Sequence, residues 1–243
     1  MLPEHFYFTG AGWLGYFIYV PIALLVTGLI YRLLLRRISL LAIRWPVMII
    51  TSIVLITWPL WGALAISYQA EILCKEQGGL HVYKTVETDG FLGGVSIKYW
   101  SKYGFDYVEG GCGKYGRSKC RKILQNGGEK NEEIPEWISQ YAVEPGETGP
   151  LRNGPFRINT FQVINRQTEE VLGDLVYFQI YPSRFDKFLL HLLPVEFNPW
   201  ICGNEAPEGK GSYSPGDKKY LYGSDDVVKA TLKSKRRSNG QVQ

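Results

Sequence analysis

Two long segments without a charged residue constrain this chain more than any other feature. They cover residues 13–31 and 45–68. At about 1.5 Å of rise per residue, helices of this length approach or exceed the hydrocarbon thickness of a bilayer, about 30 Å. Tryptophan and tyrosine stand at or near the ends of both segments, where their amphipathic rings favour a membrane interface. We therefore predict a two-helix transmembrane hairpin over residues 12–68, with helices over about 12–35 and 45–68.

The alternatives to this hairpin are two core helices of a soluble protein and, for the first segment, a cleaved signal peptide. Two uncharged runs of about 20 residues rarely occur together outside membranes. The first ten residues contain no Lys or Arg, and the first run is longer than a signal-peptide h-region. Neither run contains Asp, Glu, Lys or His, which would indicate an ion or proton pathway. A transporter or channel role for this chain alone is therefore not expected.

The basic residues near the two runs predict an orientation. All the arginines of the first 67 residues fall in the connection between the helices or beside it. The positive-inside rule then places this connection in the cytoplasm and both chain termini outside it. We predict a multi-pass protein of a bacterial inner (plasma) membrane, with a short outer N-terminus (1–11) and a periplasmic C-terminal region. The arginines that determine this topology are Arg32, Arg36, Arg37 and Arg44.

All four cysteines follow the second apolar run, at Cys74, Cys112, Cys120 and Cys202. An even number of cysteines in an outer domain suits disulfides in an oxidising compartment. We expect Cys112 to pair with Cys120 across a short glycine-rich loop, and Cys74 to pair with Cys202. Four cysteines permit three connectivities, so Cys74–Cys112 with Cys120–Cys202 stays open at this point.

A zinc site is the competing interpretation of the cysteines. The spacing between Cys112 and Cys120 is not that of a zinc knuckle, and His81 and His191 are isolated in the sequence. We therefore expect disulfides, with no metal and no cofactor.

Residues 69–202 have the pattern of an α+β domain, mainly antiparallel β, stabilised by these disulfides. Alternating or β-branched stretches predict strands over 80–86 and 95–100. The clearest signal is a hairpin over 156–165 and 170–181, joined by four polar residues.

The remaining segments of this region have weaker patterns. Glycine-rich and polar stretches predict turns over 110–116 and 126–131 and a loop over 144–155, whereas 134–143 is ambiguous between helix and strand. A short amphipathic helix is expected over 185–193. Residues 203–243 are expected to form a loose extension, with a helix over 225–233 capped by Ser224 and a disordered basic tail over 233–243.

Several motifs in the outer domain match a pattern found elsewhere. Residues 74–79 read Cys-Lys-Glu-Gln-Gly-Gly, and 82–86 read Val-Tyr-Lys-Thr-Val. Arg157-Ile158, Arg166, Leu172-Gly173-Asp174 and Cys202 follow later. Over 74–202 the chain resembles a family of uncharacterised proteobacterial envelope proteins, although Cys112, Cys120 and the residues after Cys202 depart from its pattern. The resemblance implies placement in the cell envelope and brings no activity with it.

Few function classes have a signal in the sequence. Residues 68–243 are nearly balanced in basic and acidic side chains, which argues against nucleic-acid binding. No nucleophile elbow, Walker loop, HExxH or dinucleotide fingerprint is present. For His81 and His191 a structural role is favoured over a catalytic one, because neither lies in a motif with a partner.

We therefore predict an inner-membrane-anchored protein whose periplasmic domain has a binding or structural role. Its expected partners are the lipid bilayer and another envelope protein. An envelope enzyme whose site has no recognisable motif is the alternative, and an immunity or exclusion protein of a mobile element is a third.

Overall fold

The computed structural model describes residues 3–33, 41–112, 118–152, 154–193, 195–208, 210–214 and 219–235, with backbone only at 41–44 and 213. The chain divides into two compact units, neither of which is continuous in sequence. The helical unit comprises Met1–Leu73, Leu151–Phe156 and Gln179–Trp200. The sheet unit comprises Cys74–Pro150, Arg157–Phe178 and Ile201–Gln243.

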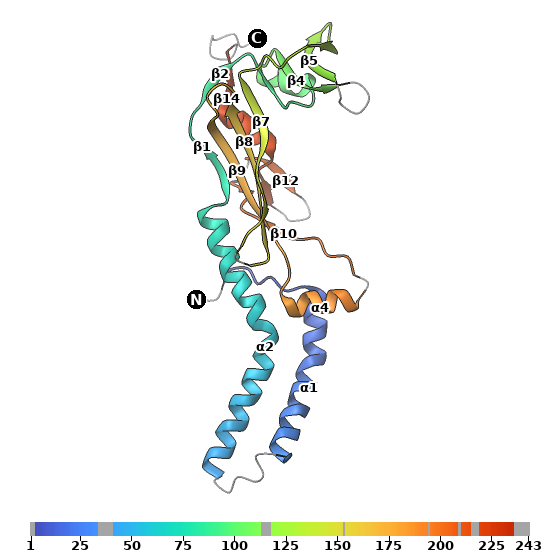
Figure 1. Ribbon diagram of the computed structural model, residues 1–243, viewed down its shortest axis with the longest axis vertical. Helices are drawn as coiled ribbons and strands as arrows, with labels where there is room; N and C mark the ends of the chain where they lie inside the picture. Colours follow the sequence, from blue (N-terminus) through green and yellow to red (C-terminus); the bar gives the residue numbers. More distant parts are fainter. Residues whose placement is uncertain are drawn as a thin grey trace. The chain divides into compact units, whose positions relative to one another are not determined.

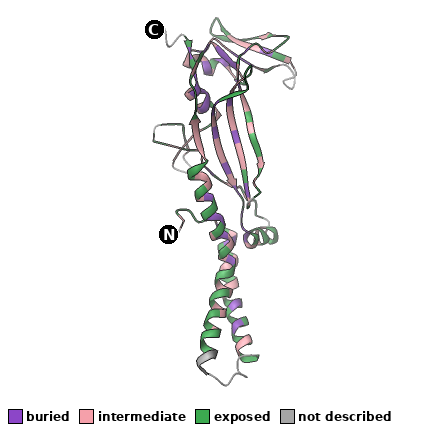
Figure 2. Ribbon diagram, turned by 60° about the vertical axis from the view of Figure 1, so that its left-hand side comes forward, coloured by how far each residue is buried: buried purple, intermediate pink, exposed green. Residues whose placement is uncertain are grey.

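Two helices of the helical unit are long and apolar enough to cross a membrane. They are α1 (Gly10–Leu33) and α2 (Leu41–Glu76), and each contains a window with a mean hydropathy of 2.0. Exposed residues lie along both helices (Figure 2), and Trp58 of α2 is 73% exposed. Core helices of a soluble protein are mostly buried, whereas only 11% and 17% of the two most apolar stretches are buried. α2 also continues well beyond the predicted end at residue 68.

The predicted topology determinants are only partly covered. Arg32 lies exposed in the last turn of α1. Arg36 and Arg37 lie outside the described residues, as does the side chain of Arg44.

Nine of the described strands form one mixed sheet, in the order β1-β9-β8-β7-β3-β4-β5-β6, with β10 also paired to β9 (Figure 1). Most neighbours are antiparallel, but β3 runs parallel to both β4 and β7. The α+β prediction is thus correct in outline, and the sheet is mixed. The strands are β1 (Gly79–Val82), β3 (Gly90–Leu92), β4 (Tyr107–Cys112), β5 (Ser118–Gln125), β6 (Gly128–Glu133), β7 (Tyr141–Pro150), β8 (Phe156–Asn165), β9 (Glu170–Ile180) and β10 (Trp200–Cys202).

Two smaller sheets accompany the large one. A parallel pair joins β2 (Val86–Thr88) to β14 (Leu232–Ser234). A three-stranded antiparallel sheet contains β11 (Glu205–Ala206), β12 (Ser212–Ser214) and β13 (Lys219–Leu221).

Two predictions from residue pattern are confirmed. The hairpin is β8 followed by β9, and the short amphipathic helix is α4 (Arg184–Leu192). The side chain of Ser183 accepts a hydrogen bond from the Asp186 amide and so caps α4.

Several predictions of local structure are wrong in whole or in part. Residues 95–100 do not form a strand: α3 (Ile97–Trp100) is a helical turn, followed by the 3-10 turn η2 (Ser101–Tyr103). Ile97 and Trp100 are both buried, and a spacing of three places them on one face of a helix. The turn expected over 110–116 is wrong in its described part, since 110–112 continue β4, and 113–117 lie outside the described residues.

The third correction concerns the loop expected over 144–155, because residues 144–150 belong to β7. The strand shifts register against β8 between Pro145 and Thr148. In the described pairing β3 contacts β7 only at Ala142. Pro145 and Pro150 therefore lie where β7 pairs with β8 alone, and their lack of an N–H removes no hydrogen bond to a second strand. The expected turn at 126–131 similarly shortens to 126–127, because β6 begins at Gly128.

The last described part of the chain, from residue 222, contributes to the core of the sheet unit, which a loose extension would not do. Helix α5 (Ser224–Thr231) follows Gly223, which occupies the cap position expected of Ser224. Val227 and Val228 pack with Leu232 into the buried cluster of the sheet unit, which also includes Phe91, Ile97, Trp100, Phe105, Val108, Val163, Leu172 and Leu175. Of the predicted tail, 236–243 lie outside the described residues.

The predicted cysteine pairing is confirmed. The Cα atoms of Cys74 and Cys202 lie 5.7 Å apart, and those of Cys112 and Cys120 lie 5.8 Å apart, both within the range for disulfides. The first bridge ties the end of α2 to β10. The second joins neighbouring strands β4 and β5.

Candidate functional site

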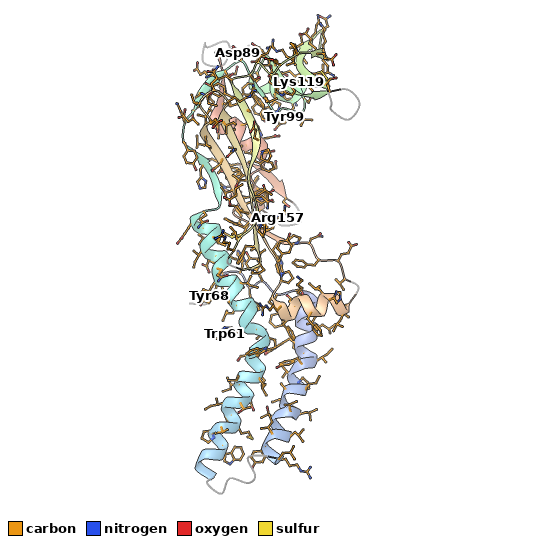
Figure 3. All side chains as sticks on the ribbon, viewed as in Figure 1. Trp61, Tyr68, Asp89, Tyr99, Lys119 and Arg157 are labelled. Atoms are coloured by element: carbon orange, nitrogen blue, oxygen red, sulfur yellow. A yellow bond between two sulfur atoms is a disulfide. The ribbon has the colours of Figure 1, made fainter. Side chains whose placement is uncertain are left out.

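A hollow in the sheet unit is the candidate binding site. It has a volume of about 220 Å³ and lies between the turn that precedes α3, β7 and the first turns of α5. Its floor is aromatic and aliphatic, and its polar groups are the hydroxyls of Ser96, Tyr99 and Ser224 and the carboxylate of Asp225. Tyr99 is labelled in Figure 3. The remaining lining residues are Phe91, Gly93, Val95, Trp100, Val143 and Val228.

The ammonium group of Lys229 lies against one wall of this hollow. The Nζ atom of Lys229 is 5.5 Å from the centre of the Tyr99 ring and 5.2 Å from that of the Tyr103 ring, and 3.3 Å from Asp226 Oδ1. These are distances for cation–π contacts combined with an ion pair. Lys229 thereby holds two tyrosines of the α3 and η2 turns against α5.

The electrostatics of this cluster favour the charged lysine and the neutral phenol. Burial alone would lower the pKa of the Lys229 ammonium, but its hydrogen bond with Tyr99 and the charge of Asp226 outweigh burial and raise the pKa above its ordinary value. Burial raises the pKa of the Tyr99 phenol, against the opposing effect of Lys229. At neutral pH the hollow therefore offers hydroxyl groups and one carboxylate, and suits a small polar group or a partner's side chain.

The rim of the hollow carries an exposed apolar residue. Val95 is 82% exposed, and its carbonyl oxygen accepts a hydrogen bond from the Lys122 ammonium at 2.6 Å. Ser96 donates to Glu129 on β6 at 2.9 Å. These two bonds fix the segment that presents Val95 to solvent.

His81 has a carboxylate partner that sequence analysis did not find. His81 on β1 lies directly opposite Asp174 on β9, with 2.9 Å between Nδ1 and Oδ1. Tyr83 donates to the other carboxylate oxygen at 3.3 Å. His81 does not line the hollow described above, and its contact with Asp174 joins two neighbouring strands of the large sheet. His191 is exposed on α4.

A second feature, in the helical unit, is the junction between α1 and α4. Asp186 of α4 is fully buried, and its carboxylate accepts the backbone N–H of Thr9 at 2.9 Å and the Thr9 hydroxyl hydrogen. The Thr9 oxygen accepts in turn from the Gly12 amide at 2.9 Å. Thr9 thus caps the first turn of α1, and the Asp186 carboxylate holds Thr9 in place and complements the helix dipole.

Beside this junction lies an apolar hollow of about 590 Å³. Trp58, Trp61 and Ile66 of α2 form one wall of it, and Pro182 and Phe185 form part of the other. Trp61 is labelled in Figure 3. Arg184 supplies the charge at its edge.

Within the described part of the chain, no three His, Cys, Asp or Glu side chains are grouped as metal ligands would be. The cysteines predicted as site residues are brought together in pairs as disulfides. Residues that sequence analysis missed are Asp186 and Lys229. The Ser183-x-x-Asp186 spacing is a capping signal for α4, but no local pattern indicates that Asp186 also binds Thr9 at the start of α1.

Comparisons with known proteins add no relative. No family model matches the chain, and neither the curated proteins nor the solved structures include a match.

Proposed function

We propose that this chain is a bacterial inner-membrane protein whose helical hairpin spans the bilayer and whose sheet unit is a periplasmic binding module for another envelope protein. The observation that carries the proposal is the exposure of the two apolar helices. Phe17, Leu25 and Trp58 are all largely exposed, and such surfaces are stable in lipid but not in water.

Two further observations support the orientation. The arginines Arg32, Arg36, Arg37 and Arg44 gather in or beside the connection between α1 and α2. Both disulfides lie in the sheet unit, which suits the periplasm and not the reducing cytoplasm.

The orientation is tested with a reporter that becomes fluorescent only in the cytoplasm. Fused to the C-terminus of the full chain, it should give no signal. Inserted after Arg37, it should give a strong one. Strong fluorescence from the C-terminal fusion would contradict both the orientation and the placement of the sheet unit.

The binding role is tested by photo-crosslinking in intact cells. A photoreactive residue at Val95, on the rim of the hollow, should give a crosslinked product, and the same residue at Thr168, in the exposed β8–β9 turn, should not. Asp225→Ala, which removes the carboxylate of the hollow, should weaken the product at Val95. Equal products from both positions, or none from Val95, would contradict a specific binding site there.

The alternatives of an envelope enzyme and of an immunity or exclusion protein are not proposed. The carboxylate partner of His81 is the feature nearest to catalytic chemistry, and it lies outside the two hollows described above.

A further inference from the structure

Helix α4 has an apolar face that the helical unit does not cover. Phe188 is 60% exposed and Leu192 is 62% exposed, and a spacing of four places both on one side of the helix. The adjoining side carries Arg184, Lys187 and His191, of which all three are exposed. An exposed apolar strip beside a basic side is the pattern of a helix that lies in a membrane interface.

Contacts of α4 with the start of α1 fix its position. Asp186 binds Thr9 at the start of α1, as described above. Phe185 stacks on Phe8 with 6.4 Å between ring centres, and meets Tyr19 edge-on at 5.8 Å. α4 therefore lies across the first turns of α1, and in this position Phe188 and Leu192 are exposed (Figure 1).

Those first turns of α1 have the composition of a membrane boundary. Trp13 and Tyr16 form an edge-to-face pair, as in the aromatic belt at a bilayer surface. Leu14, Phe17 and Ile18, one or two turns along, are exposed and apolar. The strip on α4 thus lies at the level where the apolar surface of α1 begins.

We propose that α4 lies in the bilayer interface, with Phe188 and Leu192 in the boundary between lipid headgroups and acyl chains and Lys187 and His191 toward the headgroups. The proposal rests on the membrane-spanning hairpin of the proposed function. Its occupant is the bilayer itself, because the strip continues the surface that α1 presents to lipid. The basic side matches anionic lipid headgroups.

Spin labels on single introduced cysteines test this placement. Within the described residues no cysteine is free, so a nitroxide attaches to the introduced thiol alone. The full chain, in vesicles of phosphatidylcholine and phosphatidylglycerol, carries Phe188→Cys, Leu192→Cys or Lys187→Cys. At positions 188 and 192, the nitroxide should collide more often with lipid-soluble oxygen than with a water-soluble nickel chelate. At position 187, on the basic side, the order should reverse.

Two other results at position 188 would overturn the proposal. Nickel collisions equal to those at position 187 would place the strip in water. Exclusion of both reagents would mean that a protein, either a partner or a second copy, covers it.

A third label site, Val54→Cys in the apolar part of α2, distinguishes a failure of the α4 proposal from a failure of the membrane-spanning hairpin. Oxygen exposure at Val54 with nickel exposure at Phe188 would leave the hairpin intact and remove α4 from the membrane. Nickel exposure at Val54 would contradict the membrane-spanning hairpin itself.

Discussion

Two fully buried carboxylates, Asp186 and Glu109, each hold a piece of irregular backbone in place. Asp186 accepts the Thr9 amide, and Glu109 on β4 accepts the amides of Ile138 and Ser139 at 3.0 and 2.9 Å. A buried charge without such donors would be strongly destabilising. Because each carboxylate is matched to specific N–H groups, its removal leaves those groups unsatisfied in the protein interior.

Replacing Asp186 with alanine should therefore destabilise the helical unit. Thr9 would lose the acceptor for its amide and hydroxyl, at a cost of about 1–3 kcal/mol. Thermal unfolding of the full chain in detergent micelles, followed by circular dichroism, measures the loss. Lys187→Ala changes the exposed neighbour and should shift stability by no more than about 0.5 kcal/mol. Equal effects of the two variants would show that the contact between the carboxylate and Thr9 does not stabilise the helical unit.

The raised pKa of Lys229 predicts that the stability of the protein depends on pH in the alkaline range. Its pKa in the folded protein is raised above the ordinary value of 10.5, so folding binds its proton more tightly. That stabilisation is complete below the ordinary pKa and is lost as pH rises through the higher folded pKa. In Lys229→Met the unfolding midpoint should fall less steeply above pH 10.5 than in the unaltered chain. Lys84→Met removes an exposed ion pair with Glu170 and is the control that should follow the unaltered chain.

Elements with strong local patterns could be predicted from the sequence, whereas elements determined by distant contacts could not. Two runs of β-branched and aromatic residues indicate the β8–β9 hairpin, and an amphipathic pattern indicates α4. Residues 95–100 satisfy both a strand and a helical spacing, and burial of Ile97 against the core decides for the helix. β7 contains two prolines that indicate a loop, yet it pairs along one edge with β8.

The candidate sites were less predictable than the fold. The disulfides follow from the number and placement of the cysteines, which composition reveals. The partner of Asp186 is Thr9, 177 positions away along the chain, and Lys229 meets Tyr99 only because α5 packs on the sheet. Such contacts depend on tertiary packing, which has no local period.

The close approach of α1 and α4 depends on glycine. A Cβ atom on Gly12 would lie 2.4 Å from Asp186 Oδ1, whereas one on Gly28 of the same helix would meet nothing within 4 Å. Gly12→Ala should therefore displace α4, and Gly28→Ala should not. Limited trypsin digestion detects the change, because a displaced α4 is cut faster after Arg184 and Lys187. Unchanged digestion of Gly12→Ala would show that the junction can open without loss.

At the scale of the whole molecule, the two disulfides close loops of very different length. Cys74 and Cys202 are 128 positions apart, and Cys112 and Cys120 are eight apart. The chain-entropy estimate gives about 4–5 kcal/mol for the long bridge and about 2–3 kcal/mol for the short one. Total stabilities of domains are only about 5–15 kcal/mol, so the long bridge supplies a large share.

Cys202→Ser should accordingly lower cellular abundance more than Cys120→Ser. Immunoblotting of membranes measures abundance, and denaturant unfolding of the purified variants measures stability. With reductant present the difference should disappear, because both bridges are then open in every variant. A larger loss from Cys120→Ser would contradict the entropic ranking of the two bridges.

The discontinuity of the helical unit has a consequence for biogenesis. Ribosomes add roughly 5–20 residues per second, so roughly 5–20 s separate the synthesis of Glu76, where α2 ends, from that of Asp186. Throughout this interval the nascent chain has no acceptor for the Thr9 amide and no helix packed against Gly12. A chain truncated before residue 186 thus lacks α4 of the helical unit as well as part of the sheet unit. It also leaves α1 and α2 without the contacts of α4 that complete the helical unit.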